Sequence, residues 1–434
     1  MLLKLDTEKE NKLQNILNRI NLINILNDIK KIHNINFFFV GGLVRDYFLN
    51  RNTNDIDIIT TESKKLTLLL AKYYKVGFIV LDEELEIFRI VLKKYNIIID
   101  IAKIRYNNLK KDILERDFTI NSLVLYYKNN NFYLLDLVDG LKHLQQKKIV
   151  LSSEKSLVLD PLRIMRAFRF SASLDFLIDS DTIKSIRENI LLIKNIASER
   201  LFYELSLYIN SNNILKNFDL FINVNLLPYF CGGKSNIPVV YNDKIREIID
   251  FLQNEKDIEG FFLSEIKLKD VYFTSPYHFL ILFVLFCIIY NSIFDLLIKE
   301  INISSYIKSN LKILHNNYKV FNSITSYNEL EDVFLELLIK KGDMAIILLF
   351  YILLEGKFYN KELVNIKQLF DNFRKIFYKN YKKEKLIDGK FLIEKGLSPS
   401  PIFAKILLEI EKKRIKGIIK NLHDVESFLR NKIL

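Results

Sequence analysis

The chain has little cysteine, little histidine and no long apolar run. Its 434 residues include two cysteines, Cys231 and Cys287, and five histidines. The cysteines form no disulfide framework or zinc pattern, and the histidines do not cluster. The most hydrophobic run, 277–290, is shorter than the ~20 residues that a membrane-spanning helix needs, so we expect a buried helix there. The first residues also lack the apolar core of a secretion signal. We therefore expect a cytoplasmic protein with no membrane contact.

The composition indicates the architecture of the protein but does not identify its binding partner. Half of the residues are hydrophobic, and the length predicts two to four domains with substantial cores. The formal net charge is +12 and the isoelectric point is about 9.2. This charge is compatible with an anionic partner, although a general abundance of lysine would produce it as well. A phosphate-binding motif in the same chain would favour RNA.

One short stretch near the N-terminus has the densest chemical pattern. An apolar run at 37–40 predicts a buried strand, residues 43–49 a short helix and residues 55–59 a second strand. Because alternate residues of a strand share a face, Asp55 and Asp57 project two carboxylates to one side. Paired carboxylates are typical of Mg²⁺ sites, in which water and substrate phosphates complete the coordination shell.

The turn between this strand and helix has the features of a phosphate site. Gly41 and Gly42 let a phosphate approach the backbone. The following helix offers free N–H groups and the positive end of its dipole, and Arg45 adds a fork of donors. Each feature alone is common, and an isolated Asp-x-Asp is most often a solvated loop. In this order they predict a triphosphate site beside a metal site.

An acidic residue in a later apolar strand adds a third carboxylate. The elements predicted around it are helices at 8–33 and 63–74 and strands at 76–81, 87–92 and 97–102, in one α/β unit that ends near residue 127. Asp100 lies in the last of these strands, where an acid is costly without a partner. A salt bridge or water at the strand end would satisfy it. We favour a position beside Asp55 and Asp57, where it would bind metal or help to take a proton from an attacking hydroxyl.

The ordered motifs GGLVRD and DIDI resemble the catalytic signature of the nucleotidyltransferase superfamily. Their form is similar to its tRNA nucleotidyltransferase and bacterial poly(A) polymerase branch, the class II CCA-adding type. The motif RDFTINSL at 116–123 resembles that family's second motif. By this resemblance Arg116 contacts phosphate and Asp117 contacts the ribose hydroxyls, which would favour ribonucleotides. Residues 134–150 resemble the family's hinge motif, of which Asp139 and Gly140 remain.

The segment DPLRIMRAFRF, residues 160–170, resembles the family's nucleobase-recognition motif. It predicts a helix that begins near Asp160. By the resemblance, Asp160 accepts from the amino group of cytosine or adenine and Arg163 donates to the same base, so uracil and guanine are rejected. Arg166 and Arg169 then contact phosphate or orient the helix; without the resemblance, arginines three apart would indicate a solvated basic face. The family usually has Glu where this chain has Leu159.

The predicted fold class is an α+β head with a mixed sheet and flanking helices, followed by helices alone. The predicted domains are a catalytic head at 1–145, a helical neck at 146–210 and an RNA-binding helical body and tail at 211–434. Glu199, Tyr203 and Glu204 are expected to brace the neck helices. The basic, aromatic segment 374–385 either follows an RNA backbone or is a solvated helix face.

The resemblance implies an enzyme that adds CMP, AMP or both to a tRNA 3′ end. The primer 3′-OH would attack the α-phosphate of CTP or ATP, with Mg²⁺ held by Asp55 and Asp57. The short connection at 106–108 is similar to that of enzymes that add only part of the CCA end. A bacterial poly(A) polymerase and a non-catalytic RNA-binding protein remain alternatives. No obligate protein partner is expected.

Overall fold

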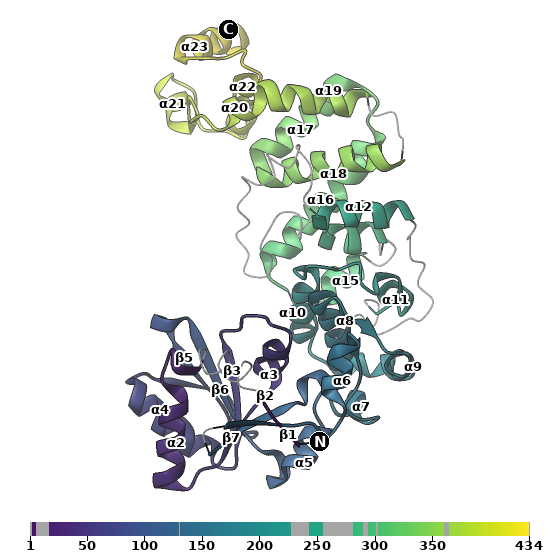
Figure 1. The fold of residues 1–434 in the computed structure, drawn as a ribbon. Coiled ribbons are helices and arrows are strands. Elements are labelled where there is room, and N and C mark those ends of the chain that lie inside the picture. The colour runs from purple at the N-terminus through teal and green to yellow at the C-terminus, as the bar shows by residue number, and fades with distance from the viewer. Residues whose placement is uncertain are drawn as a thin grey trace. The chain divides into compact units, whose positions relative to one another are not determined.

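The computed structural model describes residues 2–5, 17–129, 131–226, 243–254, 281–289, 294–300, 303–359 and 364–433. The chain divides into two compact units, residues 1–233 and 234–434. A mixed sheet with helices forms much of the first unit, and the described part of the second is helical (Figure 1). The predicted fold class is therefore confirmed. The two units are coarser than the three predicted domains, whose boundaries stay predictions.

An eight-stranded sheet forms the centre of the head, in the order β1-β8-β7-β2-β3-β6-β5-β4. Its strands are β1 (Leu2–Lys4), β2 (Phe37–Val40), β3 (Asp55–Thr60), β4 (Phe78–Asp82), β5 (Ile87–Leu92), β6 (Ile97–Lys103), β7 (Val124–Lys128) and β8 (Asn131–Leu135). The predicted strands are confirmed with small shifts at their ends. The sheet continues past residue 127 because β8 pairs with both β7 and β1. Strands β3 and β6 run parallel, and their neighbours on either side run antiparallel.

Alternation along β3 decides which side chains reach the site. Ile56 and Ile58 are buried to about 1% exposure, so Asp55 and Asp57 face the other side of the sheet. Helices α2 (Leu22–His33) and α4 (Ser63–Tyr74) pack against one another, and α4 also packs on β5 and β6 (Figure 1). The helix predicted at 63–74 is confirmed, whereas residues 8–16 of the helix predicted at 8–33 lie outside the described residues.

Short elements and the neck helices complete the first unit. They are α3 (Gly41–Phe48), η1 (Lys93–Tyr95), η2 (Arg105–Asn107), α5 (Leu109–Leu114), η3 (Thr119–Asn121), α6 (Gly140–Gln145), β9 (Lys148–Ile149), α7 (Ser156–Leu159), α8 (Arg163–Leu174), β10 (Leu177–Ile178), α9 (Ser180–Asn189), η4 (Ile190–Asn195), α10 (Ser198–Ile209) and α11 (Phe218–Asn223). Helices α8 and α10 pack closely together. They carry the charged side chains that face the head.

The described part of the second unit consists of helices. They are α12 (Asp243–Asn254), η7 (Val284–Ile289), α15 (Phe294–Glu300), α16 (Ser305–Ser323), α17 (Tyr327–Lys341), α18 (Asp343–Tyr359), α19 (Val364–Asn372), η9 (Phe373–Phe377), α20 (Tyr378–Tyr381), α21 (Gly389–Glu394), α22 (Ile402–Ile415) and α23 (Leu422–Ile433). The predicted apolar run is helical and fully buried from Ile281 to Phe286. Residues 277–280 and 290, Cys231 and the Cys287 side chain lie outside the described part. Among the described helices, none has the length and apolar character to cross a membrane.

Candidate active site

The parallel pairing of β3 with β6 brings two carboxylates together. Asp57 is the register partner of Asp100, and Asp55 lies two residues earlier on the same face of β3. Burial, together with the negative charge of Asp100, raises the pKa of Asp57 from 3.8 to about 6. An ionised Asp57 therefore needs a nearby cation.

Arg89 on β5 provides a cation for one of these carboxylates. Its Nε and Nη2 atoms donate to the two oxygens of Asp100, each at 2.8 Å. The hydrogen bond to Asp100 raises the pKa of Arg89, and the charges of Asp55 and Asp57 add to this shift. Asp100 therefore lies beside Asp57 and also forms a salt bridge, while its role in metal binding or proton transfer stays a prediction. Arg89 was not a predicted site residue; a single cation in the alternating strand IFRIVL was its only signal.

The glycine turn touches the second carboxylate directly. The Gly42 N–H donates to Asp57 Oδ2 at 3.1 Å. Gly41 has φ +69°, and a Cβ atom there would lie 2.6 Å from the same oxygen, so a side chain is excluded by both backbone conformation and space. The glycines were predicted to precede the helix, but α3 begins at Gly41 and both lie in its first turn.

Two arginines approach this turn from different elements. Arg45 on α3 is held by both oxygens of Asp46 at 2.9 Å, and its Nη1 donates to Asn121 Oδ1 at 2.8 Å. The Nε atom of Arg116 makes no hydrogen bond within the described residues and lies 3.4 Å from Asp112 Oδ1. The charge of Arg116 also lowers the pKa of Asp57. Arg116 is thus a partly unused cation close to the carboxylates.

A pocket of about 380 Å³ joins these groups. Nine of the twelve predicted site residues line it: Gly41, Gly42, Arg45, Asp57, Asp100, Arg116, Asp117, Arg166 and Arg169. Asn121 and Phe170 line it as well and were not singled out from the sequence, although both lie inside quoted motifs. The remaining three predicted residues, Asp55, Asp160 and Arg163, do not line it.

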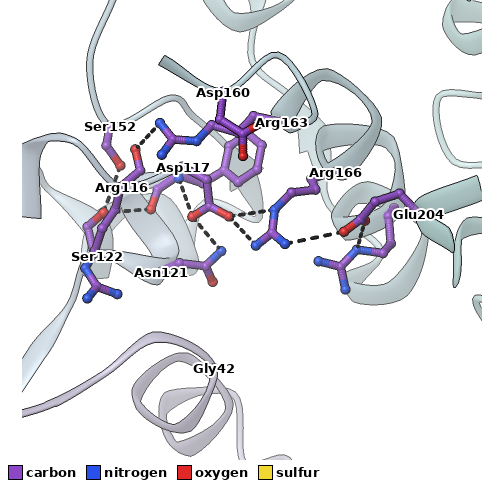
Figure 2. A network of polar contacts seen from close by, with 12 residues as sticks. Gly42, Arg116, Asp117, Asn121, Ser122, Ser152, Asp160, Arg163, Arg166 and Glu204 are labelled. Carbon is purple, nitrogen blue, oxygen red and sulfur yellow. Dashed lines mark hydrogen bonds and ion pairs between the residues drawn. The ribbon is translucent and has the colours of Figure 1, made fainter. Parts of the chain in front are cut away.

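Asp117 lies at the centre of a polar network between head and neck (Figure 2). Its Oδ2 accepts from Nη2 and Nε of Arg166 at 2.6 and 3.1 Å. Its Oδ1 accepts from the Phe118 N–H at 2.8 Å and from Asn121 Nδ2 at 3.1 Å. Burial alone would raise the pKa of Asp117, but the charge and hydrogen bonds of Arg166 outweigh it and hold the pKa well below the usual range. Asp117 is therefore ionised.

The arginines of α8 point inward instead of forming a solvated face. Glu204 on α10 forms ion pairs with Arg166 at 3.4 Å and with Arg169 at 2.7 Å (Figure 2). The guanidinium carbons of Arg45, Arg166 and Arg169 lie 5.2, 5.3 and 4.1 Å from the centre of the Phe170 ring. One aromatic ring thus spaces three cations at the edge of the pocket.

Arg163 and Asp160 are occupied by protein contacts. Arg163 is 6% exposed, and it donates to Ser156 Oγ and to the Glu115 carbonyl, both at 2.8 Å. It also donates to the carbonyl of Arg116 at 3.2 Å. One oxygen of Asp160 accepts from the Leu162 N–H at 3.2 Å, and the other lies 3.6 Å from an Arg200 nitrogen. Helix α8 begins at Arg163, slightly later than predicted.

The oxygen donors of the site fit a divalent cation. Within the described residues, no group of three or more His, Cys, Asp or Glu side chains is arranged to hold a metal ion. A cation at Asp55 and Asp57 would therefore take its remaining ligands from water and substrate, as hard cations such as Mg²⁺ do. The raised pKa of Asp57 is consistent with an uncompensated carboxylate at this position.

Comparisons with known proteins agree with this geometry. Residues 37–150 match the Poly A polymerase head domain, and residues 175–231 match the model described as the probable RNA and SrmB-binding site of polymerase A. A CC-adding tRNA nucleotidyltransferase of Geobacter sulfurreducens is 38% identical over 169 residues, which is 39% of each chain. A CCA-adding enzyme of Streptococcus uberis is 31% identical over 218 residues, 47% of this chain and 53% of that one. The chain thus spans about two-fifths to one-half of the length of these relatives.

Solved structures extend the similarity in fold to the whole chain. A CCA-adding enzyme in complex with CTP has a TM-score of 0.76 at 21% identity and covers 100% of both chains. The Thermotoga maritima CCA-adding enzyme, complexed with tRNA, has a TM-score of 0.73 at 21% identity and covers 99% of this chain. Residues 37–150 therefore belong to the Poly A polymerase head-domain family, and the chain as a whole has the fold of CCA-adding enzymes.

Proposed function

We propose that the protein is a template-independent nucleotidyltransferase that adds CMP, AMP or both to the 3′ end of tRNA. One observation supports this most directly: a single pocket in which the glycine turn, Asp57, Asp100 and Arg116 converge. The relatives named CC-adding and CCA-adding enzymes support the choice of tRNA and of CTP and ATP as substrates.

In the proposed reaction, the 3′-oxygen of the primer bonds to the α-phosphorus of CTP or ATP. The bond from that phosphorus to the bridging oxygen breaks, pyrophosphate leaves, and the hydroxyl proton passes to water. Asp55 and Asp57 would hold Mg²⁺, with Asp100 as the third carboxylate in the orientation that Arg89 gives it. Bound Mg²⁺ would supply neutralisation of phosphate charge and a lower pKa of the attacking hydroxyl.

The triphosphate would lie against the start of α3. The Gly42 N–H already points at an anionic oxygen, that of Asp57, and a phosphate oxygen can use the same kind of donor. Arg116 has an Nε donor without a hydrogen-bond partner in the described part of the chain. Arg45, fixed by Asp46, supplies positive charge with a set orientation. Arg166 and Arg169 add charge from the neck side of the pocket.

To recognise the sugar and the base, Asp117 and Arg163 would have to exchange some of their present hydrogen-bond partners for the nucleotide. We propose that Asp117 accepts from ribose hydroxyls in exchange for one or more of its four present donors. Asp160 and Arg163 would read the base only after Arg163 leaves the carbonyls of Glu115 and Arg116. Because these carbonyls precede Asp117 directly, binding of the sugar and reading of the base would be coupled. Ser156→Ala should loosen Arg163 and change the ratio of CTP to ATP use.

Two narrower activities have separate support. The connection from β6 to α5 contains little more than the η2 turn at Arg105–Asn107. Two similar proteins, from Geobacter sulfurreducens and a Synechocystis species, are named CC-adding tRNA nucleotidyltransferases. Both points favour addition of CMP alone. The head-domain match to poly(A) polymerase favours AMP addition to other RNAs.

Extension of three tRNA primers tests these activities. The primers end at the discriminator base, at C and at CC, and each is incubated with Mg²⁺ and single nucleotides, then with CTP and ATP together. A stop at CC, a stop at CCA, or addition of A to CC alone assigns the subtype. A long A ladder on unrelated RNAs would assign poly(A) polymerase.

Two matched variants serve as controls for this experiment. Asp57→Asn should abolish extension, whereas Asp28→Asn, an exposed carboxylate on α2, should extend normally. Folded wild-type protein that extends none of the primers, yet binds tRNA, would establish the non-catalytic alternative. Full extension by folded Asp57→Asn would overturn the assignment of the catalytic carboxylates.

A further inference from the structure

A second large pocket lies at the outer edge of the head sheet. Its volume is about 850 Å³, and it is formed by the end of α4, the residues that precede α2, and the η1 turn between β5 and β6. None of its lining residues lines the candidate active site. Strand β4 beside it is an edge strand of the sheet. The volume lies within the usual range of ligand sites.

Three tyrosines give this pocket aromatic walls. The rings of Tyr73 and Tyr74 meet edge to face with centres 5.3 Å apart. The Tyr74 hydroxyl donates to the Ile20 carbonyl at 2.8 Å, and burial, with the nearby phenols of Tyr73 and Tyr95, raises its pKa, so it remains a neutral anchor. Tyr73 is 55% exposed. A rigid inner ring thus supports an outer ring whose surface is open to a flat ligand.

Three cations line the same pocket, and no acidic side chain does within the part of the chain that the structure describes. They are Arg19, Lys93 and Lys94, and all three are exposed. Arg19 donates to the Tyr95 carbonyl at 3.4 Å, and the Lys94 ammonium lies 5.4 Å from the centre of the Tyr95 ring. Among the described residues, the structure gives none of these cations a carboxylate partner. The pocket therefore combines positive charge with aromatic surface, the pair of features that binds unpaired nucleotides.

We propose that this pocket binds an unpaired nucleotide, whose base stacks on Tyr73 or Tyr95 and whose phosphate contacts Arg19, Lys93 and Lys94. The same chemistry is present in a single RNA strand and in a free mononucleotide. The site is additional to the proposed substrate pocket and serves recognition only. It would give the head a contact with RNA, or with a nucleotide, that is independent of the catalytic carboxylates.

Binding of hexauridylate and of AMP to the full-length protein without Mg²⁺ tests the proposal. Lys93→Glu/Lys94→Glu should weaken hexauridylate binding about tenfold or more at low salt, and it should reduce the slope of log K against log salt by about 1.4, since two phosphate contacts are lost. Tyr73→Ala should weaken binding about fivefold or more but leave the slope unchanged, because stacking releases no counterions. Lys64→Glu/Lys65→Glu, an exposed lysine pair on α4 outside the pocket, is the matched control and should bind within about twofold of wild type.

Crosslinking tests the location of the nucleotide site, and binding of AMP distinguishes a free nucleotide from an RNA strand as its ligand. A 4-thiouridine within the hexamer should crosslink to a peptide that contains Tyr73 or Tyr95. Loss of hexauridylate binding alone identifies a strand as the ligand, and parallel loss of AMP binding identifies a free nucleotide; both results support the site. Crosslinks elsewhere only, with wild-type affinity in the two pocket variants, would overturn it. If the pocket variants lose self-association while their nucleotide binding is unchanged, the proposal would also be overturned, in favour of a protein contact at β4.

Discussion

Replacement of Arg166 by methionine tests the charge balance between head and neck. The change keeps most of the aliphatic packing of the side chain but removes both hydrogen bonds to Asp117 and the ion pair to Glu204. Loss of one partner from a buried ion pair costs about 3–5 kcal/mol. Because the Arg166 side chain is 31% exposed, water screens part of this cost, and we expect about 2–3 kcal/mol.

Scanning calorimetry measures this loss. For a unit of this size, about 1 kcal/mol shifts the melting temperature by roughly 2–4 °C, so the first unit should melt about 4–12 °C lower in Arg166→Met. Arg187→Met, the same substitution at an exposed position of α9, should change the free energy of unfolding by less than about 0.5 kcal/mol. The double variant Asp117→Asn/Arg166→Met should recover part of the loss, since the buried carboxylate is then neutral.

The sign of the pH dependence provides a second test of Arg166. Arg166 holds the pKa of folded Asp117 below its unfolded value. This pair therefore contributes stability above about pH 4, and the contribution disappears as the pH falls towards the folded pKa. The difference between wild type and Arg166→Met should narrow from pH 7 to pH 3. A loss below about 1 kcal/mol at pH 7, or an equal loss in the Asp117→Asn background, would refute the proposed coupling.

The other predictions concern the sheet and the hinge. Because burial and Asp100 raise the pKa of Asp57 from 3.8 to about 6, the folded protein loses stability as the pH rises through this interval; Asp57→Asn should raise the metal-free melting temperature above pH 6, and an unchanged melting temperature would contradict this. Arg89→Gln removes the positive charge that neutralises Asp100. Because the site then attracts cations more strongly, the Mg²⁺ concentration for half-maximal nucleotide addition should fall, whereas a rise would mean that Arg89 mainly orients Asp100. A Cβ atom at Gly140 would lie 2.3 Å from the Thr119 carbonyl, so Gly140→Ala should destabilise the head by at least about 2 kcal/mol in urea unfolding, and normal stability would show that the backbone can shift there.

Local patterns in the sequence predicted the elements well. The strand at 37–40, the helix at 63–74 and the strand at 87–92 match the structure at both ends. In each, side-chain periodicity and the flanking polar residues are sufficient to define the element. The carboxylate pair of β3 was also predictable, because alternation alone decides which residues share a face.

Long-range pairing was not predictable from periodicity. Arg89 reaches Asp100 only because β5 and β6 are neighbours in a particular register, and the sequence does not state that register. The inward turn of Arg166 depends on Asp117, which lies 49 residues earlier, and on Glu204, which lies 38 residues later. Arg163 shows the opposite effect: its motif predicts a base contact, whereas the Glu115 and Arg116 carbonyls hold it in this structure.

The order of strands in the head sheet has a consequence for biosynthesis. Leu2 in β1 pairs with Leu135 in β8, so β1 leaves the ribosome long before the strand with which it pairs. At roughly 5–20 residues per second, this delay is about 7–27 s. During that time β1 has no partner in its own sheet. Asp117 waits a shorter time for Arg166, which follows 49 residues later. Synthesis of the head thus exposes strand edges and a bare carboxylate to the cell until the first neck helices emerge.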